Sequence, residues 1–484
     1  MFVALELHGR IVMVQDAVIV GGGLAGLACA VALGDAGIRV TLLERERRLG
    51  GRACSWTDAA SGDPIDLGPH VVHSEYRNML AFLERLGTRD LICWQPGKLI
   101  TFSSGMVLRH RRLPPPFSLL PDLVRGSGLS ARDLWSNNRV TWRAMRFDEA
   151  DVPELDRVSA LEYLRALGVS EPMIEWFWSF AALSVMNVPL ERCSAAALLR
   201  VHSQLIGHRR LHFGFPAVAL SELFAAQAAD AIERAGGRVL LGAEAISIGK
   251  GVCLRDGMHL PADHVVAAVP PQDLKKLGLA APAVEPSPYI SSYLWFDRKL
   301  TGERFWALLG ALKHLNTDFY DLSNIRGGWS ARSSLIASNI IYSHRAGTMS
   351  DAEIVAATQR EIAQFFPEAA RSRVVHAVVN RIAMAIPCPL PGSESERPAA
   401  SHCAGVSLAG DWTRTGLPCS MESAVRSGWL AAEEVLRAAG RPRALALAPR
   451  PADGLVGLVQ RLRSSAARAR AWRTPPTARP RPHP

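Results

Sequence analysis

The chain has 484 residues, of which 48% are hydrophobic and 21% charged, and its mean hydropathy is +0.08. It contains no uncharged apolar run of about eighteen residues, so the composition predicts a globular protein of two or three domains and excludes a transmembrane helix. The formal net charge of +10 lies in residues 441–484, which hold ten arginines and one acid, and the rest of the chain is nearly neutral. A neutral body without a second basic patch argues against nucleic-acid binding.

The cysteines and the amino terminus indicate the compartment. The eight cysteines are scattered and form no CxxC pair, which is typical of reduced, buried thiols rather than of disulfides or a metal site. The opening MFVALELHGR places its charges after its apolar residues and lacks the long apolar stretch of a signal peptide. These features predict a cytoplasmic protein with no metal site.

The first predicted elements form a βαβ unit, with an apolar strand at 17–20, an alanine-rich helix and a second strand at 39–43. Between the first strand and the helix, GGGLAG places Gly21, Gly23 and Gly26 in GxGxxG spacing. Glycines so spaced allow a tight turn, close approach of the backbone to a pyrophosphate, and close packing of helix and strand. The unit therefore predicts a dinucleotide-binding site.

A carboxylate supports the dinucleotide site, and the glycine pair that follows it favours FAD over a nicotinamide cofactor. Glu44 ends the second strand, where a carboxylate accepts hydrogen bonds from ribose hydroxyls. Shortly afterwards, Gly50, Gly51 and Arg52 supply a second glycine pair and a guanidinium for the diphosphate or the flavin edge. An ordinary turn is the alternative interpretation of this glycine pair.

The later elements indicate one α/β domain assembled from separated segments, with a second domain inserted into it. Strands are predicted within 237–248, 263–271 and 406–411, and a helix is predicted at 421–439. Residues 95–200 are helix-patterned, and residues 288–382 mix strands with a helix. We therefore predict an α/β fold: a Rossmann-like FAD-binding domain built from discontinuous segments with an inserted α+β substrate domain. The FAD-binding segments are 16–94, 201–287 and 383–440, the substrate segments are 95–200 and 288–382, and a basic, Pro/Arg-rich tail occupies 441–484.

The stretch SLAGDWTRTGLPCSMESAVRSG, residues 407–428, places an acid at a strand tip and begins a helix soon after. If FAD lies extended across the domain, Gly410-Asp411 supplies a carboxylate for its ribityl hydroxyls. The helix that begins at Met421 directs its free N–H groups toward the flavin end, which gains negative charge on reduction. Ser420 is suited to the N-cap position of this helix.

Taken together, GGGLAG, LGGR and AGD…LP…MESAVRSG make residues 16 to 440 resemble the amine oxidase/phytoene desaturase superfamily of flavoproteins. The resemblance implies FAD as the cofactor, with the turn at Gly68 among the residues that bind it. It also implies that the adenosine ribose lies at Glu44, the diphosphate near Arg52, the adenine at the Ala245 backbone, the ribityl–diphosphate region at Asp411, and the flavin at the Met421 amide. His70, just after the Gly68 turn, is a weak catalytic candidate, with a structural histidine as the equal alternative.

Within this superfamily, IDLGPHVV, ALSVMNVP, LWFDR and TGLPCSMESAVRSG resemble the squalene-associated FAD-dependent desaturases, the hydroxysqualene dehydroxylases. That resemblance implies hydride transfer at flavin N5 and conversion of hydroxysqualene to squalene. Carotenoid desaturation of the phytoene type is the first alternative, and a flavin amine oxidase or a non-catalytic isoprenoid-binding flavoprotein is the second. The external electron donor or acceptor stays unassigned.

Two apolar segments and the tail suggest how a hydrophobic substrate is handled. MIEWFWSF at 173–180 and FSLLPDLV at 117–124 provide surface for a hydrocarbon tunnel, with ordinary helix core as the alternative. In the tail, apolar residues fall on one helical face flanked by arginines, which suggests peripheral association with the inner face of a membrane; a solubilising tail is the alternative. The apolar residues are Leu455, Leu458, Val459 and Leu462, and the arginines are Arg461 and Arg463.

Three further residues remain to be placed. Asn187 and Asp321 are weaker site candidates than His70, because polar loop residues more often satisfy backbone groups. Cys388 is expected to be a buried thiol rather than the attachment point of a covalent flavin.

Overall fold

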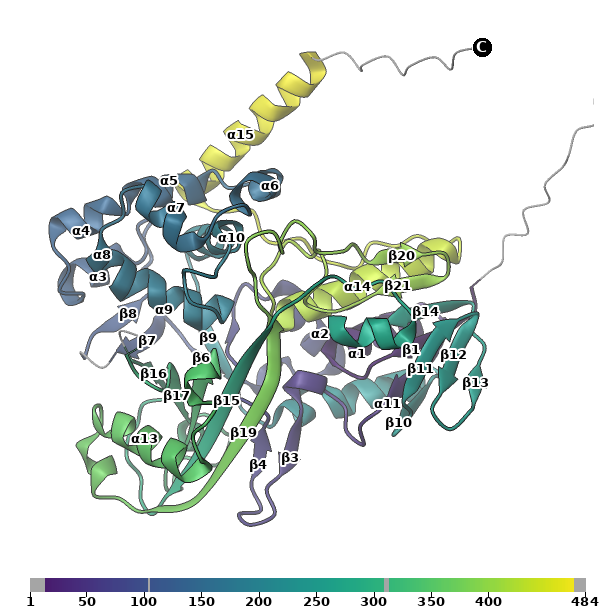
Figure 1. Ribbon diagram of the computed structural model, residues 1–484, viewed down its shortest axis with the longest axis horizontal. Helices are drawn as coiled ribbons and strands as arrows, with labels where there is room; N and C mark the ends of the chain where they lie inside the picture. Colours follow the sequence, from purple (N-terminus) through teal and green to yellow (C-terminus); the bar gives the residue numbers. More distant parts are fainter. Residues whose placement is uncertain (1–13, 103–104, 309–312, 474–484) are drawn as a thin grey trace, which may run out of the picture.

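The computed structural model describes residues 14–102, 105–308 and 313–473. Two sheets dominate it (Figure 1), one mainly parallel and one mainly antiparallel. Helices α4 to α10 form a separate layer at the upper left of the view, and α15 projects from that layer. Sheets combined with both packed and inserted helices confirm the predicted α/β class, with an inserted α+β region.

The first sheet contains the predicted βαβ unit. Its strand order is β10-β2-β1-β14-β21-β20, in which β20 alone is antiparallel to its neighbour. The strands are β1 (Asp16–Val20), β2 (Arg39–Glu44), β10 (Arg238–Leu241), β14 (His264–Ala267), β20 (Ser401–Cys403) and β21 (Val406–Leu408). The strands expected within 17–20, 39–43, 237–248, 263–271 and 406–411 are therefore all present. They come from three separated segments, and the order along the sheet requires the crossovers that helices provide.

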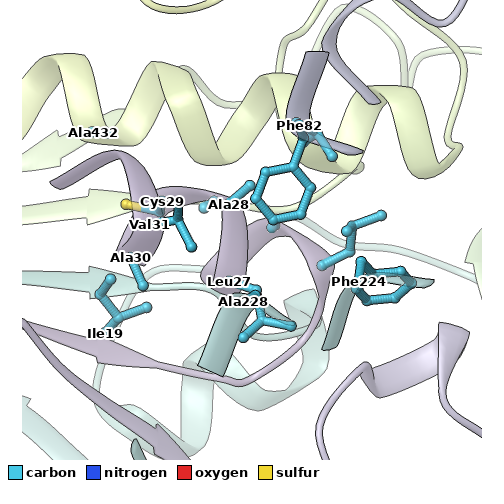
Figure 2. Packing of buried hydrophobic residues seen from close by; sticks show 14 of the residues in the cluster. Ile19, Leu27, Ala28, Cys29, Ala30, Val31, Phe82, Phe224, Ala228 and Ala432 are labelled. Atoms are coloured by element: carbon cyan, nitrogen blue, oxygen red, sulfur yellow. The ribbon is translucent and has the colours of Figure 1, made fainter. Parts of the chain in front are cut away.

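Alternation along β1 divides the side chains between the two faces of this sheet. Ala17 and Ile19 join the core beneath the helices, whereas Val18 and Val20 face the small antiparallel sheet. Four helices cover the first face: α1 (Leu24–Asp35), α2 (Arg77–Leu86), α11 (Ala226–Arg234) and α14 (Met421–Ala438). Figure 2 shows this core, in which Leu27, Phe82 and Phe224 pack against small alanines. The small sheet contains β11 (Ala245–Gly249), β12 (Gly251–Leu254) and β13 (His259–Leu260).

Helices α1 and α14 cross at very short range, which the sequence permits through a glycine. A Cβ atom on Gly428 would lie 2.2 Å from the carbonyl oxygen of Ala25. Only glycine fits where one helix backbone touches another in this way. The contact fixes the amino end of α14 beside the glycine turn that precedes α1, although the two lie almost four hundred residues apart.

The second sheet has the order β19-β15-β18-β17-β16-β7-β8. Its strands are β7 (Lys98–Phe102), β8 (Val107–Arg109), β15 (Pro286–Phe296), β16 (Phe305–Ala307), β17 (Asp318–Asp321), β18 (Leu335–Ile341) and β19 (Val374–Pro387). Helix α13 (Asp351–Ala363) covers one face through Ile362, which packs with Trp306 and Phe319. The helical pattern expected from residue 95 is wrong at its start, because residues 98–102 and 107–109 form β7 and β8 of this sheet, and β7 pairs with β16.

The remaining part of 95–200 is helical, as expected. It contains α3 (Leu120–Gly126), α4 (Ala131–Ser136), α5 (Asn138–Met145), α6 (Val152–Leu155), α7 (Ala160–Ala166), α8 (Glu171–Met173), α9 (Ser179–Ala181) and α10 (Ala195–Ile206). Two π-helical turns, Ile174–Trp178 and Ala182–Met186, flank α9. The shorter elements are β3 (Ser55–Thr57), β4 (Pro64–Asp66), β5 (Val72–His73), β6 (Ile92–Gln95), β9 (Phe213–Pro216) and α12 (Pro271–Leu274). The domain boundaries given above stay a prediction.

The last described helix, α15 (Gly454–Arg473), corrects the expected apolar face of the tail. Val456 is fully buried in the helical core, Val459 packs against it, and Arg463 donates to Asp151 at 2.7 Å. One side of α15 is therefore docked, and Val459 and Arg463 belong to that side. Leu455, Leu458 and Leu462 stay exposed. None of the helices in the described ranges is long and apolar enough to cross a membrane.

Candidate functional site

One cavity of about 1090 Å³ is lined by residues of both sheets and of the helical layer. Pockets for small ligands usually measure about 300–1,000 Å³, so this space is large enough for more than one small molecule. One end is formed by the glycine turns and the start of α14, and the other by aromatic and aliphatic side chains. These ends are called the polar end and the apolar arm.

At the polar end, the three glycines of GxGxxG have three different surroundings. Gly21 has φ +111°, and a Cβ atom there would lie 2.4 Å from the Ala268 carbonyl oxygen. A Cβ on Gly26 would lie 2.0 Å from the carbonyl oxygen of Gly21, whereas a Cβ on Gly23 would meet nothing within 4 Å. Gly21 and Gly26 are thus required by the turn itself, and Gly23 leaves open space at the cavity wall for a phosphate group.

Glu44 lies at the carboxyl end of β2, lines the cavity and is 8% exposed. Its Oε2 atom accepts a hydrogen bond from the Gly22 amide at 2.7 Å, and its Oε1 atom accepts from the Glu46 amide at 2.9 Å. Each carboxylate oxygen can accept a second bond, so the side chain is held in place with capacity for a ribose hydroxyl. Ala245, expected at the adenine, lines the same end.

The second glycine pair brings an arginine to the tip of β21. Gly50 has φ +104°, a conformation that favours glycine, and a Cβ on Gly51 would lie 3.2 Å from the Gly23 Cα. Arg52 donates from Nη2 to Asp411 Oδ1 at 2.6 Å and from Nη1 to the Ala385 carbonyl at 2.6 Å. Two motifs that are 359 positions apart in the sequence therefore meet in one charge-assisted pair at the cavity wall.

The amino end of α14 also faces this cavity, with Cys419, Ser420 and Met421 among the lining residues. The Ser420 side chain accepts from the Ser423 amide at 3.2 Å, which confirms the predicted N-cap. Gly410, at the tip of β21, has φ +151° and donates its amide to Ser427 at 2.8 Å. An eighteen-residue helix that begins at a cavity stabilises negative charge there.

His70 lines the cavity beside Gly68, and its Nδ1 atom lies 2.8 Å from the Gly68 carbonyl oxygen. Burial lowers the pKa of His70, and the nearby charge of Arg52 lowers it further. The imidazole is therefore neutral near pH 7 and donates to Gly68 from Nδ1. Of the residues predicted to bind FAD, together with His70, all but the packing glycine Gly26 line this one cavity.

The apolar arm confirms that part of the predicted tunnel surface lines a cavity. Trp176, Phe177 and Phe180 from MIEWFWSF line it, together with Leu119 from FSLLPDLV. Trp178 instead fills the helical core, where its Nε1 donates to Asn137 at 2.9 Å. Further apolar lining comes from Ile100, Phe102, Leu108, Leu205, Phe213 and Phe305.

The three remaining candidates have different outcomes. Asp321 is fully buried and accepts from the Ser323 amide at 3.0 Å and the Ser334 hydroxyl at 2.7 Å, so it stabilises a turn. Asn187 lines the cavity in the left-handed region, at φ 56°. Cys388 packs in the helical core, where burial raises its pKa to about 12.

Sequence reasoning missed one polar group of the cavity. Asp318, Tyr320 and Asn339 line the apolar arm, and Tyr289 lies beside them. These residues alternate with core residues along β15, β17 and β18, and they belong to no recognisable sequence motif. The available signal was an aspartate within the buried strand DFYD, where a charge is unfavourable without a partner.

Comparisons with known proteins agree with this geometry. Residues 24–436 match the family described as flavin containing amine oxidoreductase. Among curated relatives, the 15-cis-phytoene desaturase of Synechococcus elongatus is 28% identical over 88% of this chain and 98% of its own length. The carotenoid phi-ring synthase of Streptomyces griseus is 28% identical over 86% of this chain and 87% of its own length.

Solved structures show the same fold at low sequence identity. A redesigned putrescine oxidase superposes with a TM-score of 0.66 at 16% identity, covering 87% of this chain and 99% of that chain. Cyclohexylamine oxidase from Brevibacterium oxydans gives a TM-score of 0.62 at 20% identity, covering 88% and 100%. The chain belongs to the flavin containing amine oxidoreductase family and is an FAD-dependent oxidoreductase. The predicted superfamily and cofactor are confirmed; the closer resemblance to hydroxysqualene dehydroxylases stays a prediction.

Proposed function

We propose that this member of the flavin containing amine oxidoreductase family acts on a long isoprenoid, and that its reaction is the reductive removal of the hydroxyl group of hydroxysqualene to give squalene. The observation that carries the proposal is that the apolar arm and the polar end belong to one cavity. A hydrocarbon chain in the arm therefore reaches the end at which the flavin is expected.

The residues of the polar end fit FAD. Gly23 and Gly51 would face the diphosphate, Glu44 the ribose, and the pair of Arg52 with Asp411 the ribityl region, while the start of α14 would face the flavin ring. Bound FAD would supply hydride transfer at N5. The protein positions the cofactor and, through the buried aromatic wall, keeps water from the reacting carbon.

The apolar arm favours an uncharged chain over an amine. Its described wall is dominated by aromatic and aliphatic side chains from α9, the π-helical turn before it, α10 and the second sheet, including Phe180, Trp176 and Phe305. Beside the start of α14, where an amine oxidase resemblance would place an aromatic residue, stand Cys419 and Ser420. An amine substrate would lose solvation of its charge along the aromatic part of this arm.

Anaerobic spectroscopy of the flavin tests the reaction. The enzyme is purified with FAD, reduced chemically and mixed with hydroxysqualene. Reoxidation of the flavin with one squalene formed per flavin is expected. A flavin that stays reduced, in a protein that retains its FAD, contradicts dehydroxylation.

Carotenoid desaturation is the second candidate, because the 15-cis-phytoene desaturase of Synechococcus elongatus matches over 98% of its own length. In that reaction the substrate loses hydride to oxidised FAD instead of gaining it. Bleaching of the oxidised enzyme by phytoene, without reoxidation of the reduced enzyme by hydroxysqualene, would reverse the ranking. A bound substrate with no spectral change in either direction would favour a non-catalytic carrier.

Exposed apolar side chains near the arm support peripheral contact with an anionic membrane, from which such a substrate would enter. Leu455 and Leu458 are 45% and 47% exposed, and Phe117 is 47% exposed. The two segments meet where a Cβ on Gly454 would lie 3.2 Å from Pro115. Leu119, two residues after Phe117, already lines the cavity. This face therefore links the surface to the arm.

A further inference from the structure

A group of polar side chains interrupts the apolar arm. Asp318 on β17 and Asn339 on β18 are directly opposed in the antiparallel register, and they are 5% and 3% exposed. Tyr320 and Tyr289 complete the group, and all four residues line the cavity. Within the described ranges Asp318 forms no ion pair, so this carboxyl is buried without a compensating cation. Burying such a carboxyl costs free energy, and a titratable group buried in a cavity at that cost is a candidate for a functional role.

Hydrogen bonds fix the carboxyl of Asp318 but leave the group with spare capacity. Asn339 Nδ2 donates to Asp318 Oδ1 at 2.7 Å, and the Tyr320 hydroxyl is a second partner. Asn339 Oδ1 has no hydrogen-bond partner among the residues that the structure describes. A buried amide oxygen without a partner is uncommon, and a hydroxyl group brought by a ligand would supply the missing donor.

Burial raises the pKa of Asp318 to about 7, although the bonds from Asn339 and Tyr320 oppose this rise. The titratable groups that face it are the hydroxyls of Tyr289 and Tyr320, whose own pKa values burial raises well above the usual range. Asp318 is therefore the group of this cluster that holds and releases a proton near neutral pH.

Tyr289 connects this cluster to the polar end of the cavity. A Cβ atom on Gly68 would lie 3.3 Å from Cε1 of Tyr289, and Gly68 precedes His70. On the other side, Tyr289 interacts electrostatically with Asp318. The carboxyl thus lies on the part of the apolar arm that adjoins the residues expected around the flavin.

We propose that Asp318 is a catalytic acid for an allylic alcohol bound in the apolar arm, an inference that rests on the proposed dehydroxylation. The protonated carboxyl gives its proton to the hydroxyl oxygen, the C–O bond breaks with its electron pair on oxygen, and water leaves. Reduced FAD, when bound, would supply the hydride that the allylic carbocation needs, so that alcohol, proton and hydride give hydrocarbon and water. The carboxylate then regains a proton from solvent.

Asn339 and Tyr320 act as positioning residues in this scheme. Asn339 holds the carboxyl through Nδ2 and offers Oδ1 to the substrate hydroxyl, while Tyr320 favours the carboxylate and so keeps its pKa from rising further. A hydrocarbon without oxygen would leave this group unpaired. The cluster therefore selects an alcohol over the corresponding hydrocarbon.

The test compares wild type with Asp318→Asn in the anaerobic reoxidation of reduced, FAD-loaded enzyme by hydroxysqualene. A general acid contributes roughly 100-fold to 10,000-fold, so the variant should react at least about 100-fold more slowly with unchanged FAD content. The wild-type rate should fall as pH rises through about 7, where Asp318 loses its proton. The rate of the variant should not fall over this pH range, so its pH–rate profile should lack the falling limb. Asp297→Asn is the matched control, because Asp297 lies at the end of β15 outside the cavity, paired with Arg298 at 3.2 Å.

Two further measurements distinguish a wrong assignment of the acid from a variant that folds poorly and from a wrong proposed function. Tyr320→Phe removes a bond to the carboxylate, so the falling limb should move to higher pH even if Asp318→Asn folds poorly. Binding to the oxidised enzyme, followed by tryptophan fluorescence, should favour hydroxysqualene over squalene by about tenfold in wild type and less in Asp318→Asn. If wild type reacts and Asp318→Asn is equally fast, the acid is wrong while the proposed function stands. If wild type itself does not react, the proposed function fails and the acid with it.

Discussion

The wall of the polar end consists largely of backbone and glycines, whereas the wall of the apolar arm consists of side chains from several strands and helices. The polar end is built from a few compact motifs, each within about thirty residues of sequence. The polar cluster of the arm joins Tyr289, Asp318 and Asn339 from three strands of one sheet. Changes at the polar end should therefore weaken FAD binding, and changes in the arm should leave FAD binding intact.

The strongest test of that contrast is Gly26→Ala. Its Cβ would lie 2.0 Å from the Gly21 carbonyl oxygen, so the turn or α1 must shift. Overpacking of this kind costs about 1–3 kcal/mol or more, and we expect loss of both FAD and thermal stability. Gly23→Ala is the matched control, because its Cβ meets no protein atom within 4 Å. That variant should keep the stability of the FAD-free protein and lose FAD affinity alone; equal stability of the two FAD-free variants would contradict the assignment.

Asp411→Ala should have the next largest effect. It leaves the Arg52 guanidinium without its carboxylate partner in a pair where the side chains are 35% and 6% exposed. Removing one partner of a partly buried pair costs about 1–3 kcal/mol, and FAD should bind about 10-fold to 100-fold more weakly. Fluorescence titration of the FAD-free protein with FAD measures this. Asp35→Ala, which breaks the exposed pair with Arg85, should change neither FAD affinity nor stability by more than about 0.5 kcal/mol.

Blocking the apolar arm should leave the polar end intact. Ala181 lines the arm, and Ala181→Trp places an indole in it. We expect kcat/KM for a long isoprenoid to fall at least about tenfold, because part of the hydrocarbon would no longer be buried in the arm. The FAD content of the variant should be unchanged. Ala150→Trp, at an exposed position outside the cavity, is the control. A loss of FAD in Ala181→Trp would show that the two ends are not separable.

The buried carboxyl of the arm also predicts a pH dependence of stability. Burial raises the pKa of Asp318 to about 7, above that of an unfolded aspartate, so its contribution to stability is complete below about pH 4 and is lost as pH rises toward 7. Each pH unit in this window changes the free energy of unfolding by about 1.4 kcal/mol. Asp318→Asn does not ionise, so the melting temperature of the variant relative to wild type should increase from pH 4.5 to pH 7.5. A constant difference would contradict the raised pKa.

The same contrast explains what could be predicted from the sequence. The dinucleotide site was predictable because Gly21, Gly23 and Glu44 are close in sequence and each type has a physical reason at its place. The superfamily resemblance placed Arg52 and Asp411 each at the cofactor, but their ion pair was not predicted, because it depends on α1 packing against α14. Asp318 was not found, because only strand pairing places it opposite Asn339 and inside a cavity. Local patterns contain no information on such pairing.

Helix α15 lies outside both ends of the cavity, although Pro449 and Arg450 of the tail line it, and changes on this helix should give the smallest effect. Leu455, Leu458 and Leu462 are exposed on α15, while Val456 and Val459 hold the helix on the protein. Replacing the three leucines with serine should weaken sedimentation with anionic vesicles roughly tenfold and change the free energy of unfolding by less than about 0.5 kcal/mol. Turnover of detergent-dispersed substrate should be unchanged, because none of the three lines the cavity. The matched change Val459→Ser should instead destabilise the docked helix. If Val459→Ser weakens vesicle binding and the change of the three leucines does not, the exposed leucines are not the membrane contact.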